Sequence, residues 1–532
     1  MQPGESPSEG RIREHPILKF ERGKPVSITF NGREIKAHEG EPVAAALVAA
    51  GVDVLTRSFK YHRPRGFFCA IGKCSSCVLR INGIPNVKAC VTQVEEGMKV
   101  ETQRGFPSTN HDLLSLFDKV PIPAGFYWHK FTNRLSWSVA RPFIRSIVGI
   151  TKLTEVRPDA KTFLPSESRE VDLAIVGGGP AGISAALYAS RFGAKVALID
   201  DNPKIGGQLV KQTHKFFGSI EYYAGTRGIE LARIMRDEVE KEDKVEALTN
   251  STVVGAYGKN LIAVVQRKGS RDERLIKIRT KRLIIGTGGR ERTLIFENND
   301  LPGVMGAGGV QTLMNIYGIN PGRDAIIVGA GNVGLILAYQ MTQAGISVKA
   351  VVEAMPQFGG YYVHAAKTVR LGISLLTSHT ILKALGKKRA EGALIAKVDE
   401  QFRPVKGTER KIDADLIAIA VGFNPDCDLA IQAGAKVKYV SELGGLVPLH
   451  DKFQETSEEG LYVTGDAAGI EEATSAILQG RIAGLSAAVS LGLGGKEAIG
   501  LRETLVKALD EFRSNPFGEK IKKGKEKALL VR

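Results

Sequence analysis

The spacing of four cysteines constrains this chain more than any other feature. Cys69, Cys74, Cys77 and Cys90 follow the pattern C-x4-C-x2-C-x12-C, and the first three lie in the loop FFCAIGKCSSCVL. Two irons bridged by two sulfides need four thiolates, which one wrapped loop and one more distant anchor supply in this order. The spacing therefore predicts a [2Fe–2S] cluster and, with it, a one-electron carrier.

The segment around these cysteines predicts a small β-rich domain. Residues 26–30 (VSITF) and 33–38 are expected strands, joined by an Asn-Gly hairpin turn. Residues 41–50 (EPVAAALVAA) are an expected helix, which a glycine ends. Strand, hairpin, strand, helix and cysteine loop is the order of a β-grasp ferredoxin, which we expect over residues 20–105.

Other uses of the cysteines remain open. Structural zinc prefers two pairs of the CxxC type, and Cys90 has no close cysteine neighbour, so zinc is the less favoured ligand. A structural or vestigial cluster is a second alternative. Cys427 stands alone, and we expect a small buried residue there rather than a ligand.

Composition limits the cellular setting. A chain of 532 residues should hold several domains. It contains no run of about 18 apolar residues, so no transmembrane segment is expected. The polar start (MQPGESPSEGRIREHP) lacks an apolar signal core, and five cysteines without one suggest a reducing interior. We expect a cytoplasmic protein that reaches a membrane only peripherally, through a partner.

The net charge of +16 is large, yet it does not indicate nucleic-acid binding. Such binding would need the charge to cluster with aromatic residues or in a known module. Here the charge is spread out, except over residues 520–527 (KIKKGKEK) of a basic C-terminal tail, residues 501–532. We expect a solvated surface and no nucleic-acid partner; attraction of anionic nucleotides or of an acidic partner is the alternative.

A first dinucleotide fingerprint follows an expected strand at residues 171–176 (VDLAIV). Its glycines form G-x-G-x-x-G at the start of a helix, and the next strand, residues 195–199, ends at an acid. The first glycine allows the tight turn, the second lets the backbone approach a pyrophosphate, the third packs helix on strand, and the acid accepts from ribose hydroxyls. The candidate binding residues are Gly177, Gly179, Pro180, Ala181, Gly182, Asp200 and Asp201.

The same pattern recurs after the expected strand at residues 324–328. Gly329, Gly331 and Gly334 form the second fingerprint, and the following strand ends at Glu353. A carboxylate at that position favours a free 2′-hydroxyl, so NAD(H) is preferred over NADP(H). The alternative is a second dinucleotide fold that no longer binds its nucleotide.

Two further segments belong to the predicted binding region. Residues 283–289 (LIIGTGG) should bring Thr287 and Gly288 close to a cofactor. Residues 461–466 (LYVTGD) end in Gly465 and Asp466 before a long helix; a helix N-cap is the alternative role of this aspartate. In two-dinucleotide flavoproteins such a Gly-Asp meets the ribityl chain and pyrophosphate of the flavin. That pattern implies a split FAD-type domain, residues 169–320 and 421–500, with the NAD(H)-type domain, residues 321–420, inserted.

At this point the chain resembles a known family, the α subunits of heteromeric FAD-dependent amine and amino-acid dehydrogenases and oxidases. The group includes subunits of sarcosine oxidase, hydrogen cyanide synthase, opine oxidase and archaeal dye-linked L-proline dehydrogenase. The resemblance covers residues 20–500 and implies an α/β fold. That fold joins two dinucleotide-binding domains, as in glutathione and thioredoxin reductases, to an N-terminal β-grasp ferredoxin-like domain through a linker, residues 106–168. Its marks are Lys60-Tyr-His-Arg-Pro-Arg-Gly66, Ala124-Gly-Phe-Tyr-Trp128, Gly206-Gly-Gln208 and Leu301-Pro-Gly-Val-Met305. Gly206, Gly207, Gln208 and Leu209 are also candidate cofactor-binding residues.

The resemblance also implies cofactors and partners. FAD is expected in the first site, with NAD or ATP as the alternatives known in the family, and NAD(H) in the second. A separate β subunit should carry its own FAD, with FMN at the interface between the subunits. The implied reaction oxidises a C–N bond of a secondary amino acid such as proline or sarcosine. Electrons pass through this chain to NAD or to an artificial or quinone acceptor.

Three differences between this chain and the family limit which of the family's properties are expected here. The chain is shorter than the sarcosine oxidase α subunits that carry a folate-binding half, so folate chemistry is not expected. Some relatives have a further cysteine-rich domain, but no cysteine follows Cys427 here. Not every relative retains the cluster cysteines, whereas this chain has all four.

Two other functions remain as alternatives. A freestanding pyridine-nucleotide:disulfide reductase needs a CxxC beside the flavin, but the CxxC here, Cys74 and Cys77, belongs to the ferredoxin loop. A non-catalytic scaffold would bind nucleotides without turning them over. Hydride exchange between nicotinamide and flavin needs no protein acid or base, so no catalytic residue is named. His62 and Arg65 should fix the loop before the first cysteine, and Tyr127 and Trp128 should pack in a core or interface.

Overall fold

The computed structural model describes residues 10–59, 61–118, 135, 137–138, 165–216, 220–258, 260–267, 273–516 and 518–530. The chain divides into two compact units. Unit 1 joins Met1–Lys161 to Thr293–Val421, and unit 2 joins Thr162–Arg292 to Gly422–Arg532. The family mark at residues 124–128, with Tyr127 and Trp128, lies outside the described residues, as does Lys60.

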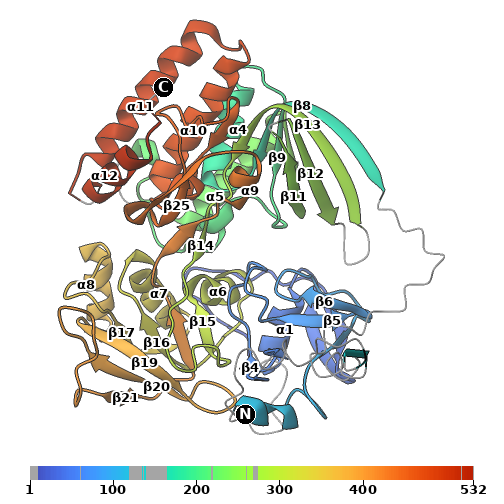
Figure 1. Ribbon diagram of the computed structural model, residues 1–532, viewed down its shortest axis with the longest axis vertical. Coiled ribbons are helices and arrows are strands. Elements are labelled where there is room, and N and C mark those ends of the chain that lie inside the picture. Colours follow the sequence, from blue (N-terminus) through green and yellow to red (C-terminus); the bar gives the residue numbers. More distant parts are fainter. Residues whose placement is uncertain are drawn as a thin grey trace. The chain divides into compact units, whose positions relative to one another are not determined.

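The first part of unit 1 is the predicted ferredoxin-like domain (Figure 1). Its five-stranded sheet has the order β2-β1-β7-β5-β6, in which β1 pairs antiparallel with β2 and parallel with β7. The expected hairpin is present, because Asn31 and Gly32 have φ of 49° and 84°, as a two-residue turn of type I′ requires. The elements are β1 (Pro25–Phe30), β2 (Arg33–His38), α1 (Val43–Ala49), β3 (Thr56–Arg57), β4 (Pro64–Arg65), β5 (Val78–Ile81), β6 (Ile84–Lys88), β7 (Lys99–Glu101) and a 3₁₀ helix (Leu113–Asp118).

The second part of unit 1 is the inserted dinucleotide fold. Its main sheet has the order β15-β22-β16-β17-β18 and is parallel throughout, and a separate antiparallel sheet has the order β19-β20-β21. The elements are β15 (Val304–Gly306), α6 (Ala307–Gln311), a π-helix (Thr312–Ile316), β16 (Asp324–Val328), α7 (Asn332–Gln343), β17 (Ser347–Val352), α8 (Tyr362–Arg370), β18 (Ser374–Leu376), β19 (His379–Leu385), β20 (Gly392–Lys397), β21 (Arg410–Ile412) and β22 (Leu416–Ile419).

The start of this inserted fold differs from the prediction. Residues 293–320, which the sequence pattern assigned to the FAD-type domain, belong to unit 1. The physical reason is strand pairing, since β15 pairs with β22 at the edge of the second sheet. A strand of three residues gives little periodic signal, so the sequence did not reveal its partner.

Both parts of unit 1 share one hydrophobic core. Ile28 and Leu47 of the ferredoxin-like domain belong to the same cluster of buried side chains as Leu313 and Leu337 of the dinucleotide fold. None of these four side chains is exposed to solvent. Apolar burial therefore holds the predicted cluster domain on the second dinucleotide fold.

Unit 2 is the FAD-type dinucleotide fold. Its sheet has the order β10-β9-β8-β13-β12-β11, and β26 pairs parallel with β13. Helices α4 and α10 pack closely, because a Cβ at Gly480 would lie 2.1 Å from the Ala181 carbonyl oxygen. The strands are β8 (Ser166–Val176), β9 (Val196–Ile199), β10 (Val245–Leu248), β11 (Ser251–Tyr257), β12 (Leu261–Arg267), β13 (Glu273–Ile285), β14 (Gly289–Glu291), β23 (Phe423–Pro425), β24 (Val437–Val440), β25 (Gly445–Pro448) and β26 (Leu461–Val463). The helices are α4 (Pro180–Ser190), α5 (Gly228–Glu240), α9 (Asp428–Gln432), α10 (Ala473–Ser490), α11 (Gly495–Arg513), α12 (Glu519–Ala528) and short 3₁₀ turns, among them Gly207–Lys211 and Gly465–Ala468.

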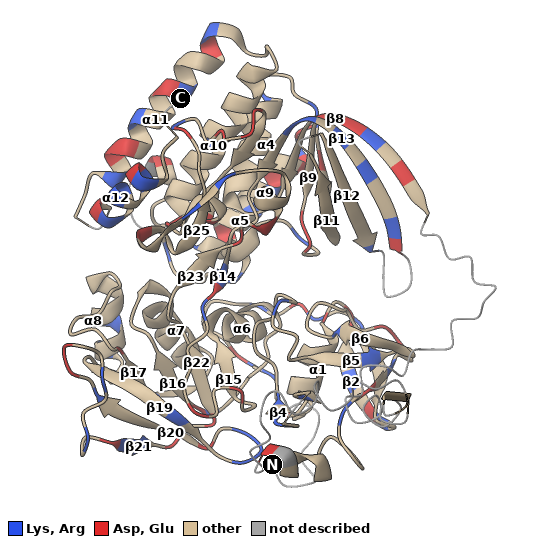
Figure 2. Ribbon diagram, in the orientation of Figure 1, with Lys and Arg blue, Asp and Glu red and all other residues tan. Residues whose placement is uncertain are grey.

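The residues expected to form a basic tail are folded. Basic and acidic positions are mixed along α11, whereas the charged positions of α12 are mostly lysines (Figure 2). Ala528 is buried with Val440 and Leu443, and the backbone of Leu530 donates to the His450 carbonyl oxygen over 3.0 Å. The segment 501–530 is thus part of unit 2, because its few apolar positions are enough to dock it. Among the helices of the described residues, none is both long and apolar enough to cross a membrane.

Candidate functional site

The four cysteines of the predicted cluster lie beside one another. The thiols of Cys74 and Cys90 donate to Cys69 and hold its pKa well below the usual range, and Cys90 likewise lowers the pKa of Cys77. These contacts connect the four sulfurs, and all four cysteines are free thiols. The structure therefore brings together the four residues that the spacing selected.

The backbone of the cysteine loop is shaped to wrap around a compact group. Ala70, Gly72 and Ser75 have φ of 60°, 68° and 59°, in the left-handed region that side chains rarely adopt. Three such residues within seven positions turn the chain repeatedly on itself. This is strained backbone of the kind that functional sites retain.

Backbone amides also point at the sulfurs. Ser76 N donates to Cys74 Sγ over 3.5 Å, and Cys90 N donates to Cys77 Sγ over 3.4 Å. Hydrogen bonds to sulfur stabilise thiolates and tune iron–sulfur potentials. In the described residues, no three His, Cys, Asp or Glu side chains surround a position for one metal ion. Four cysteine thiolates are the donor set that holds a [2Fe–2S] cluster.

His62 and Arg65 fix the loop that leads to the cysteines. His62 is fully buried, and its Nδ1 lies 2.8 Å from Asp112 Oδ2. Arg57 donates to the His62 carbonyl oxygen over 2.6 Å. Arg65 forms an ion pair with Asp300, at 3.3 Å. These contacts fit the positioning role expected of the two residues.

The first fingerprint, in unit 2, has the geometry that a dinucleotide needs. Gly177 has a φ of 108°, and a Cβ there would lie 2.1 Å from the Gly286 carbonyl oxygen. A Cβ at Gly182 would lie 1.8 Å from the Gly177 carbonyl oxygen, so helix α4 starts against the turn. Pro180 and Ala181 form the first turn of this helix. Its free backbone N–H groups can receive a pyrophosphate.

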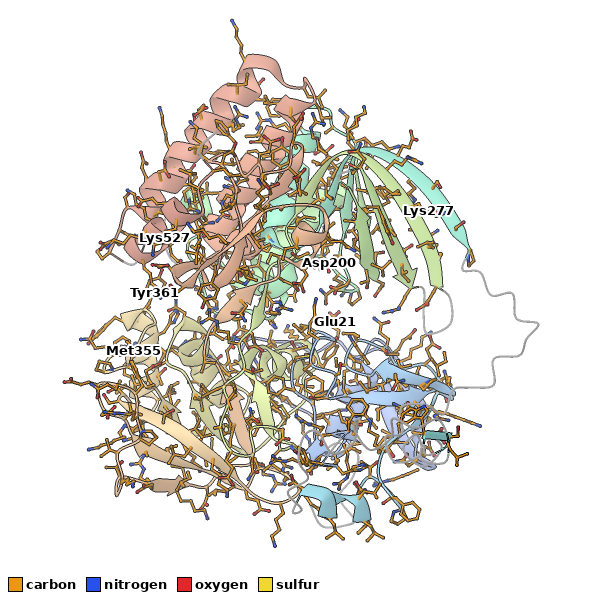
Figure 3. All side chains as sticks on the ribbon, in the orientation of Figure 1. Glu21, Asp200, Lys277, Met355, Tyr361 and Lys527 are labelled. Carbon is orange, nitrogen blue, oxygen red and sulfur yellow. The ribbon has the colours of Figure 1, made fainter. Side chains whose placement is uncertain are left out.

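Asp200 closes the first fingerprint from the end of β9 (Figure 3). Its Oδ2 accepts from Gly178 N over 2.6 Å, and its Oδ1 accepts from Asn202 N over 2.8 Å. Burial raises the pKa of Asp200, and these hydrogen bonds oppose the rise. The neighbouring Asp201 is exposed. The buried carboxylate is therefore the better placed of the two to meet a ribose.

Three further turns of unit 2 gather at this fingerprint. Gly206 N donates to the Gly178 carbonyl oxygen over 2.7 Å, so the turn Gly207–Lys211 lies against the glycines, with Leu209 buried and Gln208 exposed. Thr287 donates through Oγ1 to the Asp426 carbonyl oxygen over 2.5 Å, and Gly288 has a φ of 76°. A Cβ at Gly465 would lie 2.9 Å from Ala181 Cβ. A Cβ at Gly177 would also lie 3.1 Å from Thr287 N, so the turns at Gly206, Thr287 and Gly465 all lie against the first fingerprint.

The second fingerprint, in unit 1, repeats the first. Gly329 has a φ of 109°, and a Cβ at Gly334 would lie 2.0 Å from the Gly329 carbonyl oxygen. A Cβ at Gly331 would meet no atom of the described chain within 4 Å, so there is room for a phosphate group. Glu353 accepts from Ala330 N over 2.7 Å and from Met355 N over 2.9 Å.

A segment that the sequence did not select covers part of the second fingerprint. Gly359 and Gly360 both donate to the Ala330 carbonyl oxygen, over 3.1 and 3.0 Å. Tyr361, labelled with Met355 in Figure 3, donates through its backbone to Asn332 Oδ1 over 2.7 Å. Two glycines before an aromatic residue could have signalled such a turn, but no local pattern indicated its partner.

A buried charge cluster beside the Gly465–Ala468 turn was also missed. Glu471 accepts two hydrogen bonds from Arg513, at 2.7 and 2.9 Å, and forms an ion pair with Lys525 at 3.1 Å. Lys525 also donates to the Ala468 carbonyl oxygen over 3.0 Å. Helices α11 and α12 therefore fix the turn that carries Asp466. The sequence could not reveal this, because the partners are separated by 42 and 54 positions.

The charge cluster perturbs the groups around it. Burial alone would raise the pKa of Glu471, but Lys525 and Arg513 outweigh it and hold the pKa at about 2. Burial lowers the pKa of Lys525 to about 8 and raises that of Asp466 to about 6. In the Gly207–Lys211 turn, burial lowers the pKa of Lys211 to about 8. Perturbed groups beside a dinucleotide fingerprint are typical of functional sites.

Comparison with known proteins decides the family. The sequence model described as pyridine nucleotide-disulphide oxidoreductase matches residues 171–480, more than half of the chain. The chain belongs to this family. The model of a 2Fe-2S iron-sulfur cluster binding domain matches residues 23–105, the domain that the cysteine spacing predicted.

Within this oxidoreductase family, similar proteins are oxidase subunits. The alpha subunit of sarcosine oxidase from Rhizobium meliloti (strain 1021) is 32% identical over 466 residues, which are 84% of this chain and 44% of that protein. An opine oxidase subunit from Agrobacterium tumefaciens (strain Ach5) is 28% identical over 60% of this chain and 66% of its own length. The chain thus spans less than half of the sarcosine oxidase polypeptide that it matches.

A solved structure supports the fold. The L-proline dehydrogenase from P. horikoshii superposes with a TM-score of 0.63, at 23% identity, over 94% of this chain and 79% of that one. The overall architecture is therefore one that a solved protein adopts over nearly the full chain. The predicted flavoprotein fold with an N-terminal ferredoxin-like domain is confirmed.

Proposed function

We propose that this chain is the electron-transfer subunit of a heteromeric dehydrogenase or oxidase that acts on a secondary amino acid. The observation that carries the proposal is one compact unit holding four adjacent cysteine sulfurs and a dinucleotide fold with a carboxylate at its fingerprint. Membership of an oxidoreductase family and similarity to oxidase subunits support it.

The residues of the two fingerprints suggest one ligand each. In the first site, Asp200 and the turns at Gly206, Thr287 and Gly465 would hold FAD, with NAD or ATP as the alternatives. In the second site, Glu353 would accept from the ribose of NAD(H). Bound flavin, nicotinamide and iron–sulfur groups supply the electron chemistry, and the protein supplies position and electrostatics.

The substrate and its C–N oxidation belong to a partner in this proposal. The relatives are named as oxidase subunits, which supports a partner subunit. In this proposal, the partner is a β subunit that carries its own FAD, with FMN at the interface. Sarcosine and proline, named for two similar proteins, support a secondary amino acid as the substrate class. NAD, or a quinone or artificial dye, is the proposed electron acceptor, and we place the complex in the cytoplasm, with only peripheral membrane contact.

The first test is chemical. The native complex is purified anaerobically, and FAD, FMN, other nucleotides, iron and sulfide are counted per chain. The proposal expects iron and sulfide in equal amounts and a dinucleotide bound to this chain. Material with neither iron nor any nucleotide contradicts it.

The second test separates catalysis from scaffolding. The isolated chain is assayed for NADH-dependent dye reduction, with Glu353→Ala as the variant. Activity excludes a scaffold that only binds nucleotides, and the variant should raise the KM for NADH. An inactive chain that still holds its cofactors would favour the scaffold, and an unchanged KM would place NADH elsewhere.

A further inference from the structure

Two segments that carry the family resemblance meet inside unit 1. One is residues 61–69 of the ferredoxin-like domain, which ends at Cys69. The other is residues 298–309 of the second dinucleotide domain, which includes Leu301-Pro-Gly-Val-Met305. Neither the fingerprints nor the cysteine spacing explains why the second segment belongs to the family pattern. Its contacts with the first segment extend from Arg63 to Cys69, the first cysteine of the predicted cluster.

The contact begins with charges. Arg63 donates through Nη2 to Asn298 Oδ1 over 2.5 Å and lies 3.2 Å from Asp300 Oδ1. Arg65 reaches the other oxygen of the same carboxylate, at 3.3 Å. The Asp300 side chain is only 8% exposed, so this is a site built between the two segments rather than a chance surface pair.

The middle of the contact is tightly packed. A Cβ at Gly66 would lie 2.9 Å from Pro302 Cα and 2.9 Å from the Asp53 carbonyl oxygen. Phe67 is buried in the same core as Met305. No larger residue fits at Gly66 without separating the two segments.

The contact ends at the first cysteine. The Phe68 carbonyl oxygen accepts from Gly306 N over 3.1 Å. A Cβ at Gly309 would lie 2.2 Å from that same oxygen and 3.6 Å from the carbonyl carbon of Cys69. The bare backbone of Gly309 therefore sets how closely the cysteine loop approaches helix α6.

Strand register places this contact near the second fingerprint. Gly306 of β15 and Val328 of β16 both align with Ile419 of β22, which lies between them. Adjacent strands are about 4.8 Å apart, so Gly306 and the start of the Gly329 turn lie roughly 10 Å apart at the same edge of the sheet.

Tyr317 of the second dinucleotide domain packs against the hydrophobic core that contains Cys77 and Cys90. It follows the π-helix Thr312–Ile316, a rare element that is frequent at functional sites. The second dinucleotide domain thus meets the cysteine loop through β15 and helix α6, and Tyr317 adds to the core that the two parts share.

We propose that residues 304–311 of the second dinucleotide domain form one wall of the iron–sulfur site, with Gly309 as the residue that positions Cys69. This inference rests on the proposed function, because it requires the cysteines to hold a cluster. It adds that the domain with the NAD(H)-type fingerprint belongs to the cluster's immediate surroundings. The cluster environment should then respond to changes in a domain that supplies none of its ligands.

The test compares Gly309→Ala with Gly500→Ala in the full chain, purified with any partner that it carries. Both glycines lie in helices, but a Cβ at Gly500 meets nothing within 4 Å. The reduced cluster is examined by electron paramagnetic resonance, its midpoint potential is measured, and iron loss to a chelator is followed. Gly309→Ala should shift the g-values and the potential and speed iron loss about tenfold, as outer contacts of metal ligands commonly do. Gly500→Ala should match the wild type.

A second pair of variants keeps the proposal testable if Gly309→Ala does not fold. Gly306 has a φ of −67°, which proline also adopts, and its N–H goes to Phe68. Gly306→Pro removes that donor, whereas Gly306→Ala keeps it with a Cβ at the same place. The proline variant alone should shift the resonance signal and the potential.

The outcomes separate this inference from the proposed function. An iron-free wild type overturns both. The other outcome is a wild type that holds iron and sulfide while the spectra and potentials of Gly309→Ala or Gly306→Pro match those of the wild type. That result contradicts the proposed wall of the iron–sulfur site but leaves the electron-transfer function standing. ADP-ribose has the phosphates of NAD(H) and no nicotinamide. If Glu353 and the cluster lie at the same edge of the β15-β22-β16 sheet, adding ADP-ribose should also perturb the resonance signal of the wild type.

Discussion

Gly177 in the first dinucleotide fold and Gly329 in the second make the same turn, with φ of 108° and 109°. The third glycine of each fingerprint packs equally tightly, since a Cβ would lie 1.8 Å or 2.0 Å from the carbonyl oxygen of the first. Asp200 and Glu353 accept from the fingerprint backbone over 2.6 and 2.7 Å. The repeat shows that strand, three glycines and an acid are enough to define this local geometry.

The surroundings of the two fingerprints differ. In the first fold, a Cβ at Gly207 would lie 2.7 Å from the Cα of Gly179, and Asp200 is only 6% exposed. In the second, Gly360 comes almost as close, since a Cβ there would lie 2.9 Å from the carbonyl carbon of Gly331, but Glu353 is only half-buried. This difference predicts a slowly exchanging ligand in the first site and a freely exchanging one in the second.

The largest effect should come from the charge cluster, which is present beside the first fingerprint. Glu471→Gln leaves the buried cations Arg513 and Lys525 without their carboxylate, which should lower the free energy of unfolding by about 3–5 kcal/mol. The first site should lose its ligand while the second keeps NADH affinity. Urea denaturation and nucleotide titration measure both. Glu519→Gln, which removes an exposed pair with Lys523, is the control and should change neither.

The same cluster gives a pH dependence with a definite sign. The pKa of Glu471 is about 2 in the folded chain, below the value of about 4.3 expected when unfolded. The stabilisation is therefore complete above pH of about 4.3 and is lost as the pH falls toward 2. The wild type should lose stability through this window more steeply than Glu471→Gln. Parallel acid denaturation curves would contradict the assignment.

Overpacking each fingerprint should have an intermediate effect. Gly182→Ala and Gly334→Ala each force a Cβ against a carbonyl oxygen, at a cost of about 1–3 kcal/mol of unfolding free energy. Each variant should empty its own site and spare the other. Gly331→Ala is the matched variant, because its Cβ has room; it should keep stability and weaken only the second site. Loss of both ligands from either overpacked variant would show that the sites are not independent.

The carboxylates should give the smallest effect. Asp200→Asn and Glu353→Gln remove the charge and keep one accepting oxygen, but they set an amide NH2 against the second backbone N–H. This should weaken binding roughly tenfold at the affected site. Glu353→Gln should also reduce the preference for NADH over NADPH. Titration of each cofactor measures the affinity of both variants. An equal loss of affinity at both sites from one substitution would contradict the independence of the two sites.

Much of the fold could be predicted, because its signals are local. The hairpin at Asn31, the cysteine loop, both fingerprints and the acids at their strand ends lie where the pattern placed them. The errors concern contacts between distant residues. The pairing of β15 with β22 moved residues 293–320 into unit 1, and the docking of α12 turned an expected tail into part of unit 2.

The amino-acid sequence alone determined which residues form the candidate binding sites, because cysteine spacing, glycine turns and strand-end acids act within short stretches of chain. Only the tertiary structure decided which pieces share a core. It put the cysteine loop against Gly309 of the second dinucleotide domain and Lys525 against Glu471. Such contacts depend on burial and on shape between residues far apart in sequence, and neither has a periodic or spaced signature along the chain.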